Sequence, residues 1–242
     1  MGVNITKTSL GNIPILMYEG KHAKRCVFLQ HGIYGNKEKV MQLMGVTIAQ
    51  LGYVVVAIDT VGHGERGESP FVDGKTPHGE LRMFDLIEPT AEDILAVYEV
   101  HLKARFDTFD YIGISLGGLV GYYLASQTDR IDRLHILMST PNYEAFYEHI
   151  SPAIETRYKT LIEQGKKKVQ AINPSLKSKR LTFEKLFVYH GLNDQEIPLS
   201  ATTDWLEKTT LEGVQVRTFE TGHKINKAMF EALKEHLAIP EG

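Results

Sequence analysis

The sequence predicts an α/β fold in which a mostly parallel, eight-stranded sheet carries helices on both faces. Strand-like and helix-like segments alternate along most of the 242 residues, an order typical of such a sheet. The apolar runs at residues 26–29 and 53–58 do not alternate with polar positions, as expected of parallel strands covered on both faces. The other segments, taken in order, fit this class.

The chain begins with two predicted strands, at residues 3–10 and 13–18. The Gly-Asn pair between them suits a tight antiparallel turn. A helix is predicted over residues 39–51, between the two buried strands, because its apolar side chains recur at helical spacing. It ends at Gly52, a residue that readily adopts the left-handed conformation of a helix terminus.

The remaining two thirds continue the alternation of strands and helices. Pro89 followed by Thr90 predicts a helix start, because the threonine hydroxyl would cap the helix and Asp93 stands three residues further on. The other predicted segments are strands at residues 111–114, 134–138, 186–189 and 214–219, and helices at residues 116–125, 201–208 and 224–237.

Two stretches interrupt this pattern. Residues 65–86 are polar and rich in Gly and Pro, which favours a long loop. Residues 141–182 are too many for a structureless connection inside a compact domain, so we expect a small helical insertion there. The chain is therefore predicted to be a single domain, residues 1–242, with a lid or cap insertion at about 141–182.

Composition and charge exclude several classes of protein. The 27 Lys and Arg residues and 30 Asp and Glu residues give a net charge of −3, which argues against nucleic acid as a partner. Cys26 is the only cysteine, so neither an internal disulfide nor a thiolate-rich zinc site is expected. Without a visible secretory signal or an apolar run near ~20 residues, we expect a cytoplasmic protein with no stable membrane insertion. A homo-oligomer and a monomer are both left open.

The motif G-x-S-x-G at residues 113–117 lies where a predicted buried strand ends and a helix starts. In that context it predicts a nucleophile elbow, a sharp turn whose flanking residues must lack bulk. Ser115 would then project above the carboxyl edge of the sheet, where the helix start favours negative charge. A dinucleotide-binding loop would need an earlier strand and a glycine in place of the serine, so we expect no cofactor.

A nucleophilic serine needs a base within reach and a group that orients the base. Asp194 follows the strand predicted at residues 186–189, and His223 follows the strand predicted at residues 214–219. Both are therefore expected at the same edge of the sheet as Ser115. The order Ser, Asp, His along the chain differs from the orders in chymotrypsin-like and subtilisin-like enzymes.

Four local patterns make the sequence resemble the α/β-hydrolase superfamily over nearly its whole length. They are H-G-x-x-G at residues 31–35, D-T-V-G-H-G at 59–64, the serine elbow, and H-G-x-x-D-x-x-I-P at 190–198. The extended pattern H-G-x-x-G-N-K-E, at residues 31–38, is similar to that of small bacterial-type carboxylesterases.

This resemblance implies a serine hydrolase that cleaves a small-molecule carboxylic ester through Ser115, Asp194 and His223 and an acyl-enzyme intermediate. It also implies an oxyanion hole made of the backbone N–H groups of Ile33 and Leu116. A thioesterase or a peptidase would use the same machinery. A non-catalytic ligand-binding protein on the same scaffold is a rival of another class, although such proteins usually lose a member of the triad.

Several other residues are candidates for roles in the site. Tyr34 has three interpretations: it lines the acyl pocket, packs on its loop, or donates its hydroxyl to the oxyanion, as a loop tyrosine does in prolyl-oligopeptidase-like members. Asp59 and Glu196 are alternatives to Asp194, but the superfamily places the first in a turn and the second has the wrong spacing. The histidines lack the spacing of a zinc protease, so we expect no metal.

The insertion is unusually basic. Residues 157–185 contain nine basic and two acidic side chains. Apolar residues of the insertion, among them Phe146, Ile150 and Leu161, suit one or two amphipathic helices. The functional interpretation is a cap that covers the acyl pocket and attracts acidic substrates, and the simpler interpretation is a set of solvated helix faces and turns.

Overall fold

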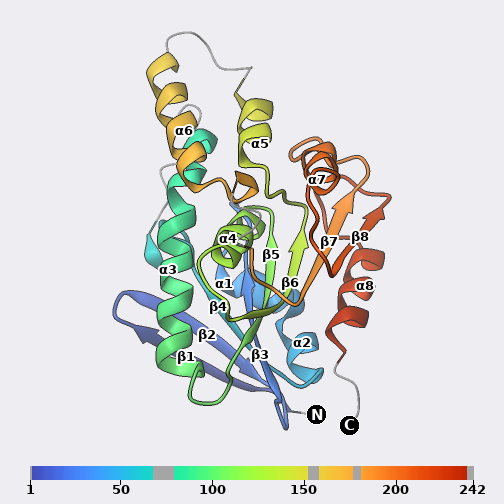
Figure 1. Cartoon of the computed structure of the whole chain (residues 1–242). Helices are drawn as coiled ribbons and strands as arrows, with labels where there is room; N and C mark the ends of the chain where they lie inside the picture. The colour runs from blue at the N-terminus through green and yellow to red at the C-terminus, as the bar shows by residue number, and fades with distance from the viewer. Residues whose placement is uncertain (1, 68–78, 152–157, 177–180, 239–242) are drawn as a thin grey trace.

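The computed structural model describes residues 2–67, 79–151, 158–176 and 181–238. Within these residues an eight-stranded sheet has the order β1-β2-β4-β3-β5-β6-β7-β8 (Figure 1). Strands β3 to β8 run parallel, and β2 pairs antiparallel with both β1 and β4. The strands are β1 (Asn4–Leu10), β2 (Ile13–Glu19), β3 (Arg25–Gln30), β4 (Tyr53–Ile58), β5 (Phe109–Ile114), β6 (Ile131–Leu137), β7 (Lys185–Gly191) and β8 (Val214–Phe219).

Helices cover both faces of the sheet (Figure 1). A π-helical turn joins α1 to α2, and a second π-helical turn follows α3. No helix in the described ranges is both long and apolar enough to cross a lipid bilayer. The helical segments are α1 (Lys37–Val40), η1 (Met41–Gly45), α2 (Val46–Gln50), η2 (Gly64–Arg66), η3 (Gly79–Leu86), α3 (Ile87–Val97), η4 (Tyr98–Leu102), α4 (Leu116–Ala125), α5 (Tyr143–Ile150), α6 (Lys159–Ile172), α7 (Ser200–Leu206) and α8 (Lys227–Leu237).

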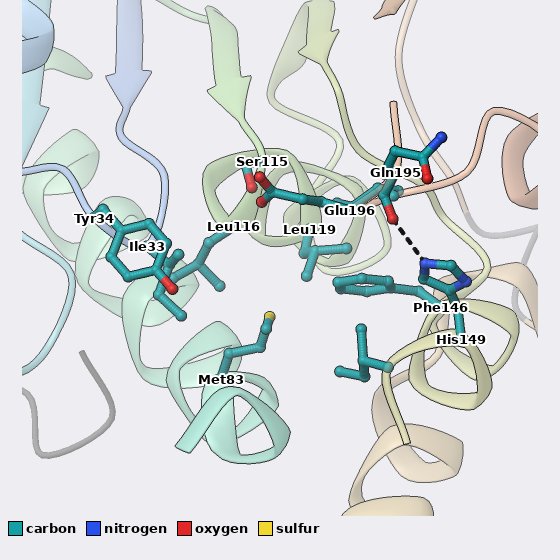
Figure 2. Close-up of a pocket in the computed structure, with 12 residues that line it drawn as sticks. Ile33, Tyr34, Met83, Ser115, Leu116, Leu119, Phe146, His149, Gln195 and Glu196 are labelled. Carbon is teal, nitrogen blue, oxygen red and sulfur yellow. Dashed lines mark hydrogen bonds between the residues drawn. The ribbon is translucent and has the colours of Figure 1, made fainter. Parts of the chain in front are cut away.

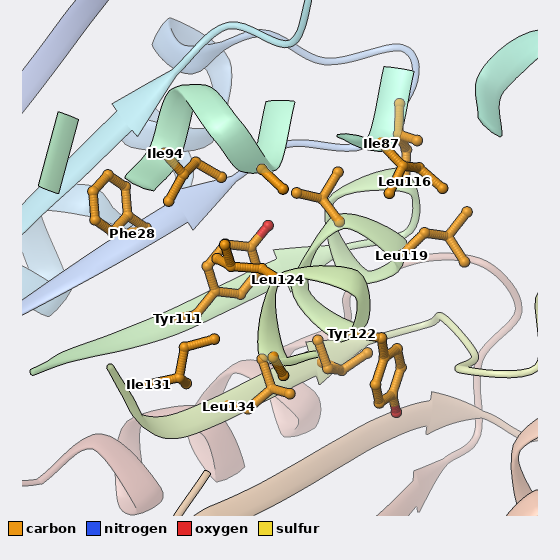
Figure 3. Packing of buried hydrophobic residues seen from close by; sticks show 14 of the residues in the cluster. Phe28, Ile87, Ile94, Tyr111, Leu116, Leu119, Tyr122, Leu124, Ile131 and Leu134 are labelled. Carbon is orange, nitrogen blue, oxygen red and sulfur yellow. The ribbon is translucent and has the colours of Figure 1, made fainter. Parts of the chain in front are cut away.

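The sheet separates two hydrophobic cores. Along β4, Val54 and Val56 belong to the core that the sheet shares with α3 and α4. Val55 and Ala57 belong to the core on the opposite face, which includes side chains of α2 and α8. Figure 3 shows the first core, where apolar side chains of α3, α4, β5 and β6 meet. Burial on both faces is the reason why these strands are apolar at every position.

The predicted architecture is confirmed. Helix α4 and strands β4 and β8 have the predicted bounds, and the other predicted strands differ by a few residues at their ends. Thr90, however, does not cap α3, which begins at Ile87 directly after η3. Its hydroxyl instead donates to the carbonyl oxygen of Leu86 at 2.6 Å. Pro89 is tolerated there because the first amides of a helix have no acceptor within it.

The predicted loop at residues 65–86 is only partly a loop. Residues 79–86 form the 3-10 helix η3, in which Leu81 and Phe84 are buried against the core. The ring of Phe84 contacts the ring of Phe146 in α5, with 5.9 Å between the ring centres. Four of the eight residues at 79–86 are apolar, and their packing gives this part of the predicted loop a regular structure. Residues 68–78 of the prediction lie outside the described residues.

Helices α5 and α6 occupy the predicted insertion and rise above the carboxyl edge of the sheet (Figure 1). They are linked by a hydrogen bond in which the Tyr147 hydroxyl donates to the carbonyl oxygen of Ile162 at 3.0 Å. Lys168 of α6 forms an ion pair with Glu88 of α3. One of the basic side chains therefore anchors the insertion to the sheet domain, while residues 152–157 and 177–180 lie outside the described ranges.

Candidate active site

Ser115 occupies a strained turn between β5 and α4. It is the single residue between the two elements, with φ 53° and ψ −113°, on the side of backbone space that residues with side chains rarely adopt. A Cβ on Gly113 would lie 2.3 Å from the carbonyl oxygen of Gly117, and one on Gly117 would lie 2.5 Å from that of Gln30. The glycines of the motif are thus required by the close approach of strand and helix.

Asp194 is fixed in a tight turn after β7. One of its carboxylate oxygens accepts hydrogen bonds from the backbone amides of Glu196 and Ile197, both at 3.0 Å. The other accepts from Nδ1 of His223 at 2.8 Å. Burial alone would raise the pKa of the Asp194 carboxyl, but the hydrogen bonds from His223 and Ile197 outweigh burial and lower the pKa below its ordinary value. The carboxyl is therefore an ionised acceptor.

His223 lies between Asp194 and Ser115. The loop that carries it is joined to the loop after β7, because the amide of Asn193 donates to the carbonyl oxygen of Thr221 at 3.0 Å. Since Nδ1 carries the proton donated to Asp194, Nε2 is an acceptor, and the Ser115 hydroxyl donates to it at 2.9 Å. The three residues singled out from the sequence therefore form one hydrogen-bonded series.

The loop at residues 31–35 lies directly against the serine. A Cβ on Gly32 would be 3.3 Å from the Cβ of Ser115. His31 fixes this loop, because its Nε2 accepts from the amide of Thr60 at 3.1 Å and its Nδ1 donates to the carbonyl oxygen of Gly32 at 2.8 Å. Burial lowers the pKa of His31 to about 4, so the ring is neutral at pH 7.

The two residues whose amides are expected in an oxyanion hole both lie near Ser115. Leu116 is the first residue of α4, so its amide has no acceptor within the helix. Ile33 follows Gly32 on the adjacent loop, and its carbonyl oxygen accepts a hydrogen bond from Nε2 of His63 at 2.7 Å. That bond fixes the peptide group between Ile33 and Tyr34. The amide of Ile33 belongs to the preceding peptide, whose Gly32 carbonyl oxygen accepts from Nδ1 of His31 at 2.8 Å and from the amide of Gly35 at 2.9 Å.

The G-N-K-E part of the loop motif is structural. The Asn36 side chain caps α1 by accepting from the amide of Lys39 at 2.9 Å. The buried ammonium of Lys37 lies 2.7 Å from Asp59 and 2.5 Å from Glu65. Asp59 therefore serves this ion-pair cluster, and the carboxylate that contacts His223 Nδ1 belongs to Asp194.

Three acidic side chains lie close together beside the loop motif. In the described part of the chain, Glu38, Asp59 and Glu65 form a group of acidic side chains with oxygen atoms within 4.8 Å of one another. The ammonium of Lys37 already contacts all three, at 2.5 to 2.9 Å. A positive charge of this chain thus occupies the position that a cation would need.

Two cavities meet at Ser115. The smaller, of about 210 Å³, lies under the insertion and has a mostly apolar lining (Figure 2). The larger, of about 400 Å³, lies on the side of His223 and Lys224. Tyr34 borders both and is 73% exposed. The smaller cavity is lined by Ile33, Tyr34, Met83, Ser115, Leu116, Leu119, Phe146, His149, Ile150, Gln195, Glu196 and Ile197.

Comparison with known proteins defines the class. The family model of the alpha/beta hydrolase fold matches residues 26–189, and the chain belongs to this family. It is 27% identical over 218 residues to the protein named "Putative esterase YitV" of Bacillus subtilis (strain 168). The aligned region covers 83% of this chain and 82% of that protein. Together with the fold, these matches identify the chain as a hydrolase similar to esterases.

Solved structures show the same fold at low sequence identity. TT1662 from Thermus thermophilus has a TM-score of 0.78 at 21% identity, with both chains covered completely. A cold-adapted esterase from an Arctic intertidal metagenomic library has a TM-score of 0.67 at 16% identity, with 98% of each chain covered. An acylaminoacyl peptidase of Pyrococcus horikoshii has a TM-score of 0.68 at 14% identity, over 97% of this chain and 40% of the peptidase.

Two residues near the site were not assigned these roles from the sequence. His63 binds the Ile33 carbonyl across a gap of thirty residues, and Lys37 joins the loop motif to Asp59. Both belong to motifs that were recognised, D-T-V-G-H-G and G-N-K-E. The two motifs follow neighbouring strands, and the ends of neighbouring parallel strands meet at one edge of the sheet. This placement could have indicated from the sequence that His63 and Lys37 contact the other motif.

Proposed function

We propose that this protein is a serine hydrolase that cleaves carboxylic esters of small molecules through an acyl-enzyme intermediate. The observation that carries the proposal is the hydrogen-bonded series from Asp194 through His223 to Ser115 at the edge of an apolar cavity. His223 takes the proton of the Ser115 hydroxyl as the serine oxygen bonds to the ester carbonyl carbon. The ionised Asp194 stabilises the imidazolium that results.

The negative charge on the carbonyl oxygen needs donors that are already in place. We assign these to the backbone amides of Ile33 and Leu116, two residues near Ser115. The tetrahedral intermediate then collapses, the carbon–oxygen bond to the alcohol breaks, and His223 gives its proton to the departing alkoxide. A water molecule, deprotonated by His223, releases the acyl group by the same steps.

We assign the acyl group to the smaller cavity. Its lining is mostly apolar, and Phe146 and Ile150 contribute to it from α5. Residues 141–182 are accordingly proposed to act as a lid over the acyl pocket. The same relay also suits thioesters and activated amides, so matched ester, thioester and anilide substrates with one acyl group decide the preferred bond.

The test compares the wild-type protein with Ser115→Ala on p-nitrophenyl acetate. Loss of the nucleophile is expected to lower turnover by about 10⁶-fold, to the level that positioning and oxyanion donors alone provide. The far-UV circular dichroism spectrum is expected to stay unchanged, because alanine fits the same turn. Equal hydrolysis by both proteins would contradict the assignment. A wild-type protein that hydrolyses no ester would favour the non-catalytic ligand-binding protein.

A further inference from the structure

Glu196 is an acidic side chain at the mouth of the site whose carboxylate the hydrolytic steps do not use. It borders both cavities, and Figure 2 shows it beside Ser115. Its Oε2 lies 3.7 Å from Nε2 of His223, the nitrogen to which the Ser115 hydroxyl donates. Its backbone amide donates to Asp194 at 3.0 Å, so the turn that orients the triad also places the backbone of Glu196 beside it, while the side chain is 65% exposed.

The contact with Nε2 places the carboxylate on the alcohol side of the ester. The leaving oxygen must come within hydrogen-bond distance of His223 Nε2 to receive its proton. A carboxylate 3.7 Å from that nitrogen is therefore near the first atoms of the alcohol. A positive charge two or three carbons beyond the ester oxygen can approach Glu196 while the carbonyl stays at Ser115.

Glu196 provides the negative charge at the mouth of the site. It is the only acidic side chain in the described lining of either cavity, and Lys224, the only lysine or arginine there, lines the larger cavity. Tyr34 borders both cavities together with Glu196. An aromatic ring and a carboxylate at one mouth are the groups that bind alkylammonium ions, through the face of the ring and through charge attraction.

We propose that Glu196 and Tyr34 form a subsite for a positively charged group on the alcohol part of the substrate. The inference rests on the proposed esterase function and narrows its substrate class to esters of amino alcohols, with tertiary or quaternary ammonium groups as the simplest members. Glu196 acts in recognition, and the bonds made and broken at Ser115 are the same for charged and neutral esters.

The test uses two acetates of nearly equal shape, acetylcholine and 3,3-dimethylbutyl acetate, which differ in a charged nitrogen and a neutral carbon. The measured quantity is the ratio of their kcat/KM values, obtained from acetate release. The wild-type ratio is expected to exceed one and to fall as salt is added. Glu196→Gln is expected to lower the ratio by about three- to tenfold, and Tyr34→Ala to lower it as well.

Glu207→Gln is the matched control, because Glu207 is exposed on the surface and lines neither cavity. Its ratio is expected to equal that of the wild-type protein. An unchanged ratio in Glu196→Gln, with both acetates still hydrolysed, would overturn the subsite while leaving the esterase function in place. Hydrolysis of neither acetate by the wild-type protein would overturn both.

Discussion

Lys37 shows how a single buried charge supports the site. Its side chain is 2% exposed, and the residue lies in the loop motif, six residues after His31. Burial would lower the pKa of its ammonium, but hydrogen bonds to Asp59, Glu65 and Glu38 outweigh burial and raise it. The ammonium stays charged and neutralises the fully buried carboxylate of Asp59, which also accepts from the Lys37 amide at 2.8 Å.

Replacing Lys37 should therefore be costly. We predict that Lys37→Met lowers the free energy of unfolding by about 3 kcal/mol or more, because Asp59 would keep a buried charge without its partner. Urea denaturation followed by fluorescence measures the change. Lys39→Met, two residues further on the same helix and exposed, is the control and should change stability little. Equal stability of the two variants would show that the ion pair contributes nothing.

A catalytic candidate could be predicted from the sequence only where a short sequence pattern marks its position in the fold. Ser115, Asp194 and His223 each follow a strand that the apolar pattern reveals, so the shared edge of the sheet could be inferred. The bond from His63 to the Ile33 carbonyl could not, because it depends on the path of two loops that pack together in the fold. The cavity beside Glu196 also has no local signature.

At the scale of elements, α5 is the part that shapes the smaller cavity. Phe146 is almost completely buried, and its ring lines the cavity opposite Ile33 and Tyr34 (Figure 2). Apart from the imidazole of His149, Phe146 is the only aromatic side chain that the insertion contributes to the described lining of this cavity of about 210 Å³. If the smaller cavity holds the acyl group, as proposed above, the size of this ring limits how far an acyl chain can extend toward α5.

We predict that Phe146→Ala moves the acyl-chain optimum to longer p-nitrophenyl esters, because the missing ring enlarges the pocket. The kcat/KM values over a series from acetate to decanoate measure the shift. The cost in stability is expected to be about 3–5 kcal/mol, so the assay needs a temperature well below the unfolding midpoint. Leu176→Ala, an exposed residue of the same insertion, should keep the wild-type optimum. An identical optimum in Phe146→Ala would place the acyl chain elsewhere.

The elements themselves differ in how well sequence predicts them. Buried strands such as β4 are apolar throughout and could be located closely, as could α4 after the serine motif. The stretch at residues 65–86 is polar as a whole, but four of the eight residues at 79–86 are apolar, and this segment is helical where Leu81 and Phe84 pack against the core. The start of α3 was misplaced for the same reason, since η3 continues directly into it.

At the scale of the whole molecule, neutral histidines are part of the buried interior. Burial lowers the pKa of His31 to about 4 and lowers that of the fully buried His135 well below its ordinary value. His135 stacks on Phe187 with 4.7 Å between ring centres, and its Nε2 has no hydrogen-bond partner in the described chain. Protonating either ring would place an uncompensated charge in the protein interior.

This arrangement predicts loss of stability in mild acid. Between pH 6.5 and 4 the unfolded chain binds protons at these histidines and the folded protein does not, so the free energy of unfolding falls with pH. His31 alone should account for about 2 kcal/mol between pH 7.5 and 5. Urea denaturation at the two pH values measures the fall, with the exposed His22→Asn as control and His135→Phe expected to reduce it. Equal stability at both pH values would contradict the burial argument.

We expect Ser115 to be a strong nucleophile, unlike the other serines of the chain. A fluorophosphonate reagent reacts covalently with such a serine, and peptide mass mapping locates the product. We predict one adduct per chain, on Ser115, and none in His223→Ala, which lacks the base. Absence of an adduct in the wild-type protein, or an adduct on another residue, would contradict this prediction.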